Sequence, residues 1–181
     1  MTDSRPLDPP SAFVERWIHD IAPVTPGQLA ALDVAMGRGR HAYALARAGF
    51  RTFGVDLSWD AVCAAVAAIE ARGCQMSGWC ADLKTTPLPR GRFDVIVVTR
   101  YLQRDLFPSL VGALAPGGVI LYETFTEAQR THGWGPTSPA HLLAAGELPT
   151  YFSELEVLFY EEVEGPEAVA RLAARAVRRR S

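Results

Sequence analysis

Four consecutive β-branched residues, Val95 to Val98, place the strongest constraint on the fold of this chain. A run like this has no polar face to turn toward water, so it fits a strand that is covered on both faces. Strands of this kind belong to parallel sheets with helices packed on each side. The segment from Phe93 to Val98 therefore predicts a central buried strand and an α/β fold.

Segments of strand and helix character alternate on both sides of this run. We expect further strands at Leu29 to Ala35, Arg51 to Val55, Gln75 to Cys80 and Val119 to Tyr122. Helices are expected after Gly39, from Trp59 to Ala71 and from Asp105 to Leu114, and a Pro-containing loop follows Asp82. Because strands that alternate with helices are joined by right-handed crossovers, the pattern predicts a doubly wound sheet.

The two ends of the chain depart from this alternation. Met1 to Pro10 predicts a loose arm, and a helix begins near Ser11. After the last parallel strand we expect a long loop from Thr124 to Pro139, a short helix near Ala140 to Leu148, and two strand-like runs, Leu155 to Val163 and Ala168 to Val177.

Gly165-Pro166 separates these two runs and leaves no room for a crossover helix. We therefore expect them to pair as an antiparallel hairpin at one end of a seven-stranded, mostly parallel sheet. Because the second run is rich in alanine, a helix from Glu167 onward is the alternative.

Composition narrows the class of protein. The 181 residues are 49% hydrophobic and 21% charged, as expected for one globular domain over residues 1–181. A net charge of −2 gives no reason to expect nucleic acid as a partner, and no run approaches the ~20 apolar residues of a membrane span. The three cysteines, Cys63, Cys74 and Cys80, lack metal-ligand spacing and favour a location in the reducing cytoplasm. The sequence does not indicate the oligomeric state.

Polar and glycine residues stand at the carboxyl ends of three successive predicted strands, the edge where open α/β sheets bind ligands. Gly37 and Gly39 follow the first strand, where they let a ligand approach the backbone at a helix N-terminus. Asp56 follows the second strand, 17 residues beyond Gly39, and could accept hydrogen bonds from a ribose diol. Asp82 and the Leu83 N–H follow the third strand and could contact a base. Together they predict a nucleoside site.

The glycine turn alone leaves the ligand open. Gly37, Gly39 and Ala42 also satisfy the G-x-G-x-x-A form of the dinucleotide motif, so an NAD-dependent oxidoreductase is one alternative. It is weakened by the hairpin ending, which leaves no second mononucleotide-binding half, and by the presence of a single lysine, Lys84. A non-catalytic nucleoside- or partner-binding protein is the other alternative, since fold and function are separable.

Several stretches resemble the motifs of class I S-adenosylmethionine-dependent methyltransferases, in the order of that family. They are Ala31 to His41, Val55 to Ser58, Ala81 to Leu83, Phe93 to Ile96, and Leu114 to Gly118, and the resemblance spans about residues 29 to 178. Gly146-Glu147-Leu148 and the Leu155 to Val163 ending are most similar to the tellurite-resistance-like group.

The resemblance implies S-adenosyl-L-methionine as the cofactor. Asp33 would orient the turn and the methionine amino group, Gly37 and Gly39 would lie beside the methionine portion, Asp56 would hold the ribose, and Asp82 with Leu83 the adenine. The full set of implied cofactor contacts is Asp33, Ala35, Gly37, Gly39, Arg40, Asp56, Leu57, Asp82, Leu83 and Arg100. The family usually has glycine where this chain has Ala35 and often cysteine where it has Met36, so the methyl group of Ala35 narrows the turn.

The methyl acceptor is expected to be a small molecule, because the short insert after the fifth strand adds no domain to hold a macromolecule. Residues expected to face it are Tyr101, Tyr122, Glu123, Arg130 and His132. His132 or Glu123 could remove a proton from the acceptor, but methyl transfer requires mainly alignment, so no catalytic residue is assigned. Tyr101 and Tyr122 could instead cap the core, and His132 could be a surface residue.

Overall fold

The computed structural model describes residues 7–177, so Met1 to Pro6 of the predicted arm lie outside the described residues. A seven-stranded sheet with the order β3-β2-β1-β4-β5-β7-β6 runs through the molecule. The strands are β1 (Ala30–Val34), β2 (Arg51–Asp56), β3 (Met76–Cys80), β4 (Phe93–Thr99), β5 (Leu114–Phe125), β6 (Glu156–Glu164) and β7 (Ala168–Arg175). The helices are α1 (Ala12–Ile21), α2 (Arg40–Arg47), α3 (Trp59–Glu70), α4 (Phe107–Ala113) and α5 (Glu147–Thr150). This is the doubly wound, mostly parallel α/β sheet that the sequence predicts.

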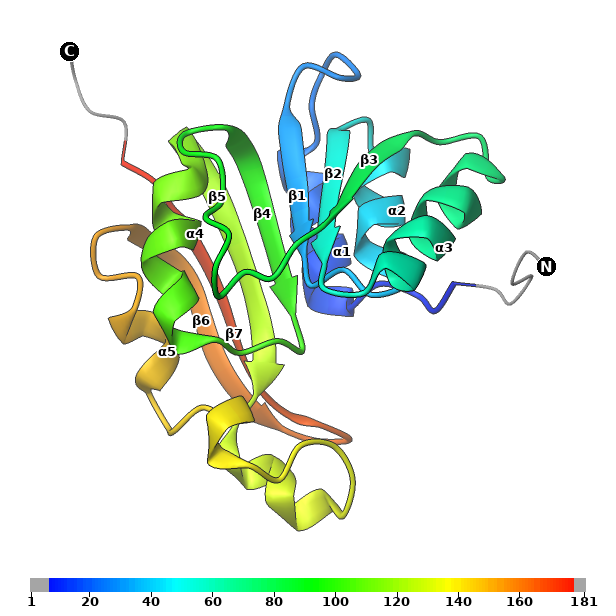
Figure 1. Cartoon of the computed structure of the whole chain (residues 1–181). Coiled ribbons are helices and arrows are strands. Elements are labelled where there is room, and N and C mark those ends of the chain that lie inside the picture. Colours follow the sequence, from blue (N-terminus) through cyan, green and yellow to red (C-terminus); the bar gives the residue numbers. More distant parts are fainter. Residues whose placement is uncertain (1–6, 178–181) are drawn as a thin grey trace.

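The first five strands are parallel, with β4 beside β1 at the centre as the β-branched run predicts. Figure 1 shows α1, α2 and α3 gathered on one side of the sheet and α4 and α5 on the other. Val95 and Val97 pack toward α1 and α2, whereas Ile96 and Val98 pack toward α4. Burial of both faces explains why this strand carries no polar face.

The C-terminal hairpin is confirmed, and β7 is a strand rather than the alternative helix from Glu167. β7 pairs antiparallel with β5 along Val119 to Phe125, and β6 pairs antiparallel with β7 at the edge of the sheet. Ala170, Ala173 and Ala174 are fully buried between the two flanking strands. The alanines of β7 therefore fit a strand that packs closely between its neighbours, and they do not indicate a helix.

Two expected elements, the fifth strand and the helix after it, differ in the structure. β5 begins at Leu114 rather than Val119, because Pro116-Gly117-Gly118 lies inside an irregular strand start and does not form a separate turn. It also extends to Phe125, beyond Tyr122, because β7 supplies backbone partners there. The expected helix from Ala140 to Leu148 is replaced by a 3₁₀ turn at Pro139–His141 and by α5.

The extended backbone between those two helical turns has a clear cause. Leu143 forms a parallel bridge to Thr126 and donates its backbone N–H to the Phe125 carbonyl at 3.0 Å. Gly146 then takes a left-handed conformation (φ +73°), which ends any helix before Glu147. The expected loop from Thr124 to Pro139 holds a further 3₁₀ helix, Glu127–His132.

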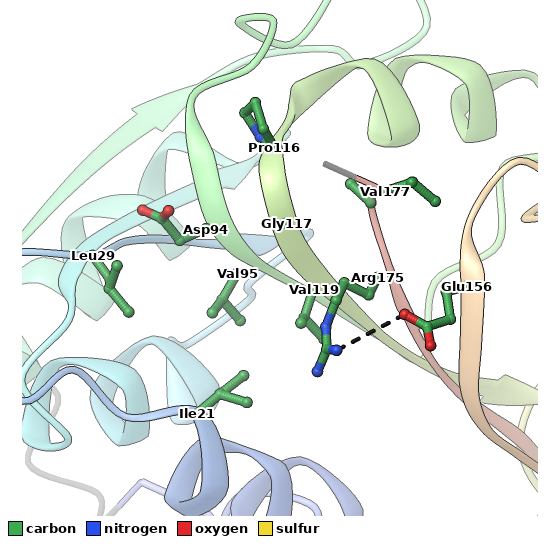
Figure 2. A pocket seen from close by; sticks show the side chains of 11 residues that line it. Ile21, Leu29, Asp94, Val95, Pro116, Gly117, Val119, Glu156, Arg175 and Val177 are labelled. Atoms are coloured by element: carbon green, nitrogen blue, oxygen red, sulfur yellow. Dashed lines mark ion pairs between the residues drawn. The ribbon is translucent and has the colours of Figure 1, made fainter. Parts of the chain in front are cut away.

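A cavity of about 540 Å³ lies at the amino-terminal edge of the parallel strands (Figure 2). Asp94 on one wall accepts a hydrogen bond from the Ala30 N–H, and the Arg175–Glu156 ion pair, 3.8 Å apart, stands on the other. Ligands of open α/β sheets bind at the opposite, carboxyl edge, so this cavity is separate from the expected cofactor site. Over residues 7–177, no helix is both long and apolar enough to cross a membrane.

Candidate active site

The turn between β1 and α2 has backbone conformations that favour glycine. Ala35, Gly37 and Gly39 all have positive φ, at 52°, 53° and 80°. A Cβ added at Gly39 would lie 2.9 Å from the Ala65 Cβ, so this glycine allows the turn to pack against α3. A Cβ at Gly37 would meet nothing within 4 Å, so that glycine borders open space. The two glycines thus differ in function, one for packing and one for access.

Two carboxylates hold this turn in place. Asp56 accepts hydrogen bonds from the Gly37 N–H at 2.8 Å and the Ser58 N–H at 2.9 Å, so it joins the end of β2 to the turn. Asp33 is fully buried and accepts from the Ala42 N–H at 2.9 Å. Its Oδ1 has no hydrogen-bond partner among the described residues, and burial raises its pKa to about 7. Asp33 ties β1 to α2, and its contact with a methionine amino group stays a prediction.

The predicted nucleoside residues line one cavity of about 620 Å³ at the carboxyl edge of β1, β2 and β3. Six predicted site residues meet there: Ala35, Asp56, Leu57, Asp82, Leu83 and Tyr101. Asp82 accepts from the Lys84 N–H at 2.9 Å, which fixes the loop after β3. Burial, followed by the Asp82, Asp105 and Asp56 carboxylates, raises the pKa of the Tyr101 phenol, so it stays protonated.

A second cavity of about 520 Å³ lies on the other side of the glycine turn. Its lining includes the predicted residues Ala35, Gly37, Arg40 and Arg100. Because Ala35 also lines the nucleoside cavity, the two cavities meet at this residue. Burial, and then the charge of Arg100, lower the pKa of Arg40. Two arginines that line one cavity favour an anionic group in it.

Sequence reasoning missed several residues of these walls. Gln103 lines the nucleoside cavity and donates to the Leu83 carbonyl at 3.3 Å. His41 lines the second cavity, accepts from the Ser11 N–H at 3.1 Å and contacts the Thr99 hydroxyl at 3.2 Å. Burial lowers the pKa of His41 to about 3, so it is neutral and links α1 to β4. Gln103 follows β4 as Arg100 does, which is a usable signal. His41 ends the stretch from Ala31 that resembles the family, although the resemblance implies no role for it.

Tyr122 and Glu123 have structural partners rather than an open side toward an acceptor. Tyr122 is 1% exposed in the core, where its hydroxyl donates to the Tyr101 carbonyl at 2.8 Å. Glu123 is 5% exposed and forms an ion pair with Arg171 at 2.6 Å, and Arg171 also contacts Glu161. The register that places Glu123, Arg171 and Glu161 side by side across β5, β7 and β6 explains this pairing.

The other two predicted acceptor residues lie on the 3₁₀ helix after β5. Arg130 is exposed. His132 lies 2.8 Å from the Gly165 carbonyl through its Nε2, which must donate because a carbonyl only accepts. His132 therefore anchors the helix to the turn of the β6–β7 hairpin. Arg100 also reaches the hairpin, through an ion pair with Glu167.

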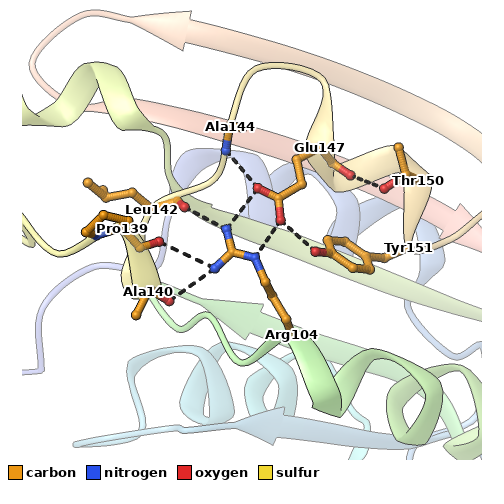
Figure 3. A network of polar contacts seen from close by, with 8 residues as sticks. All are labelled: Arg104, Pro139, Ala140, Leu142, Ala144, Glu147, Thr150 and Tyr151. Atoms are coloured by element: carbon orange, nitrogen blue, oxygen red, sulfur yellow. Dashed lines mark hydrogen bonds and ion pairs between the residues drawn. The ribbon is translucent and has the colours of Figure 1, made fainter.

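Arg104 fastens a wall of the nucleoside cavity (Figure 3). Its guanidinium contacts both carboxylate oxygens of Glu147, at 2.6 and 2.9 Å, and donates to the Leu142 carbonyl at 2.9 Å. Glu147 also accepts from the Tyr151 hydroxyl at 2.6 Å and from the Ala144 N–H at 2.8 Å. This network, which we call the Arg104 clasp, holds the segment that brings Ala140 and His141 to the cavity.

Comparisons with known proteins agree with this arrangement. A family model described as a methyltransferase domain matches residues 31–118. No curated protein matches the sequence. An S-adenosylmethionine-dependent methyltransferase from Mesorhizobium loti has a similar structure, with a TM-score of 0.69, 19% identity, and coverage of 88% of this chain and 96% of that one.

Two further structures are similar. TehB from Haemophilus influenzae has a TM-score of 0.74 and 20% identity over 90% of this chain, which spans 61% of TehB. Geranyl diphosphate C-methyltransferase from Streptomyces coelicolor A3(2) has a TM-score of 0.70 and 15% identity over 90% of this chain and 79% of that one. At these identities the likeness shows the shared fold.

The residues present fit the cofactor that the fold implies. The Gly37 backbone borders open space, carboxylates of Asp56 and Asp82 share one cavity, and arginines line the adjoining one. The methyltransferase-domain match and the shared fold agree with S-adenosylmethionine as the cofactor of this site.

Proposed function

We propose that this chain transfers the methyl group of S-adenosylmethionine to a small-molecule acceptor. The observation that carries the proposal is the pair of cavities that meet at Ala35. Asp56, Asp82 and the Leu83 backbone would hold the nucleoside in one cavity. Arg40 and Arg100 would face the methionine carboxylate in the other, which leaves the acceptor at the carboxyl end of β4.

The chain's own residues would act by positioning. When bound, S-adenosylmethionine supplies an activated methyl group, so the protein needs mainly to align the acceptor with it. Glu123 is paired with Arg171, and the Nε2 of His132 donates to the Gly165 carbonyl, so both side chains have structural partners in the scaffold. We therefore assign no catalytic residue to proton removal.

We also propose a subgroup and a cellular location for this protein. Similarity to the tellurite-resistance-like group is supported by Gly146-Glu147-Leu148, in which Glu147 joins the Arg104 clasp and Leu148 is buried. A cytoplasmic location is supported by Cys63, Cys74 and Cys80, which are free thiols. No observation on the described residues favours the NAD-dependent or the non-catalytic alternative. We propose a small molecule as the partner, and neither nucleic acid nor a membrane.

Calorimetric and thermal-shift titrations with S-adenosylhomocysteine and NAD, run in parallel, test the cofactor. At a ligand concentration of 100 Kd we expect S-adenosylhomocysteine to raise Tm by roughly 5–10 °C, since a native-state ligand adds about 2.7 kcal/mol. NAD should leave Tm unchanged. Binding of NAD without S-adenosylhomocysteine would contradict the proposal.

Substitution of Asp56 tests the ribose assignment within the same assay. Asp56→Ala should weaken S-adenosylhomocysteine binding by about 1–3 kcal/mol, because charged hydrogen bonds to the ribose are lost. Asp56→Asn keeps an acceptor for the Gly37 N–H and should weaken S-adenosylhomocysteine binding less than Asp56→Ala does. Asp60→Asn, an exposed change in the first turn of α3, is the control. Unchanged affinity in Asp56→Ala would remove the ribose assignment.

A further inference from the structure

The connection from β3 to β4 differs from the other crossovers of the parallel strands. α2, α3 and α4 join β1 to β2, β2 to β3 and β4 to β5, whereas residues 81–92 contain no helix (Figure 1). α2 and α3 cover one face of β2 and β3. On the opposite face of these two strands, this helix-free connection and the start of β4 lie beside β2 and β3.

A cavity of about 640 Å³ lies on that face, with aromatic side chains on its wall. Phe53 from β2, Trp79 from β3 and Phe93 from β4 contribute to the lining. The Phe53 and Phe93 rings stand edge to face, with centroids 5.9 Å apart, and Phe53 and Trp79 are only half-buried. Edge-to-face and stacked geometries are those in which a further aromatic ring can be added.

Two cations line the same cavity. Arg51 and Arg92 are exposed, and the Arg51 guanidinium carbon lies 5.8 Å from the Phe53 ring centroid. Within residues 7–177, neither guanidinium forms an ion pair with a carboxylate. Positive charge beside apolar rings complements a ligand that is both flat and negatively charged.

The cavity is distinct from the cofactor site. Arg51 is the first residue of β2 and Asp56 the last, so the two sites lie roughly 16 Å apart along one strand. From these observations we propose that the face formed by Arg51, Phe53, Trp79, Arg92 and Phe93 binds a small aromatic anion. The half-buried rings of Phe53 and Trp79 contact the flat part of the ligand, Phe93 supports Phe53 from the core, and Arg51 and Arg92 bind the anionic group.

Two naphthalene probes of similar size and opposite charge test this proposal. Calorimetry with 2-naphthoate and 2-naphthylmethylammonium should show at least tenfold tighter binding of the carboxylate. The double variant Arg51→Gln/Arg92→Gln should weaken naphthoate binding by about tenfold, the upper range for two partly exposed ion pairs. Arg72→Gln in the turn after α3, outside this cavity, is the matched control and should bind naphthoate as the wild type does.

Further measurements distinguish this aromatic face from the cofactor site and from a dimer interface. In the wild type, naphthoate should shift the NMR signal of the Trp79 indole N–H, and saturating S-adenosylhomocysteine should not displace it. Equal binding of both probes, full affinity in the double variant, or displacement by S-adenosylhomocysteine would overturn the proposal. A wild-type dimer that the double variant dissociates would also overturn it, because a second copy of the chain would then cover this face.

Discussion

Ala35 has a side chain in a backbone conformation that favours glycine. Its φ of 52° costs roughly 1–2 kcal/mol for a residue with a Cβ. Replacement by glycine relieves this strain, but glycine also makes the unfolded chain more flexible, which costs up to about 1 kcal/mol of stability. We expect Ala35→Gly to raise the free energy of unfolding by about 0–1 kcal/mol and to tighten S-adenosylhomocysteine binding, since the methyl group between the two cavities is removed.

The control is the same change at an ordinary helical position. Ala46→Gly within α2 should lower the free energy of unfolding by about 1 kcal/mol. Urea denaturation and calorimetry measure both effects. Equal destabilisation by the two changes would show that Ala35 is not strained.

Met36 shows how a second unusual residue of the turn is accommodated. A Cβ at Gly54 of β2 would lie 2.1 Å from the Met36 sulfur, and one at Gly78 of β3 would lie 3.6 Å from its methyl carbon. Met36 itself is 5% exposed and packs against Val62 and Ala65 of α3. Glycines on two neighbouring strands therefore make room for a side chain larger than the cysteine often found in the family.

Asp33 and His41 make opposite contributions to the pH dependence of stability. With a folded pKa of about 7, Asp33 stabilises the fold most below pH 3.8, and this contribution is lost as pH rises toward 7. With a folded pKa of about 3, His41 stabilises the fold above pH 6.5, and this contribution is lost as pH falls toward 3.

We expect Asp33→Asn to make the free energy of unfolding rise more steeply with pH between 4 and 7. Urea titrations compared with Asp60→Asn test this, and parallel profiles for Asp33→Asn and the wild type would refute it.

At the scale of elements, the Arg104 clasp holds the segment between β5 and β6 against the start of α4. Arg104 and Glu147 are 38% and 16% exposed, and the hydrogen bond from Arg104 is the main cause that lowers the pKa of Glu147 to about 2. We expect Arg104→Ala to cost about 1–2 kcal/mol of stability, after allowance for solvent screening. Amide exchange at Ala140 and His141 should become faster.

Arg47→Ala is the matched control for the clasp, because the Arg47–Glu15 pair is more than half exposed on both sides. Its cost should stay below about 0.5 kcal/mol. If exchange near His141 were the same in Arg104→Ala as in the wild type, another contact would be holding the segment.

At the scale of the whole molecule, the last strand in the sequence lies inside the sheet. β7 is hydrogen-bonded on both sides, whereas β3 and β6 form the two edges. We expect the amides of β1, β4, β5 and β7 to exchange most slowly in native-state hydrogen exchange, and those of β3 and β6 faster. Fast exchange along Val169 to Ala174 would contradict the central position of β7.

The order of strands and helices was predictable from the sequence because periodicity, turn residues and β-branched runs are local signals. The β-branched run at Val95 to Val98 identified the central strand, and Gly165-Pro166 identified the hairpin. The positions of Asp56 and Asp82 after their strands brought both to one cavity, since parallel strands end at one edge. The helix expected at Ala140 to Leu148 failed because Leu143 pairs with the distant Thr126.

Only the tertiary structure decided what each polar side chain contacts. Glu123 and Arg171 are 48 residues apart, and they meet because the register of β5 against β7 places them together. Arg104 and Glu147 are 43 residues apart and meet through packing of α5 near α4. The order of strands and turns follows from local sequence, but the partners of buried charges depend on register and packing, which no local pattern contains.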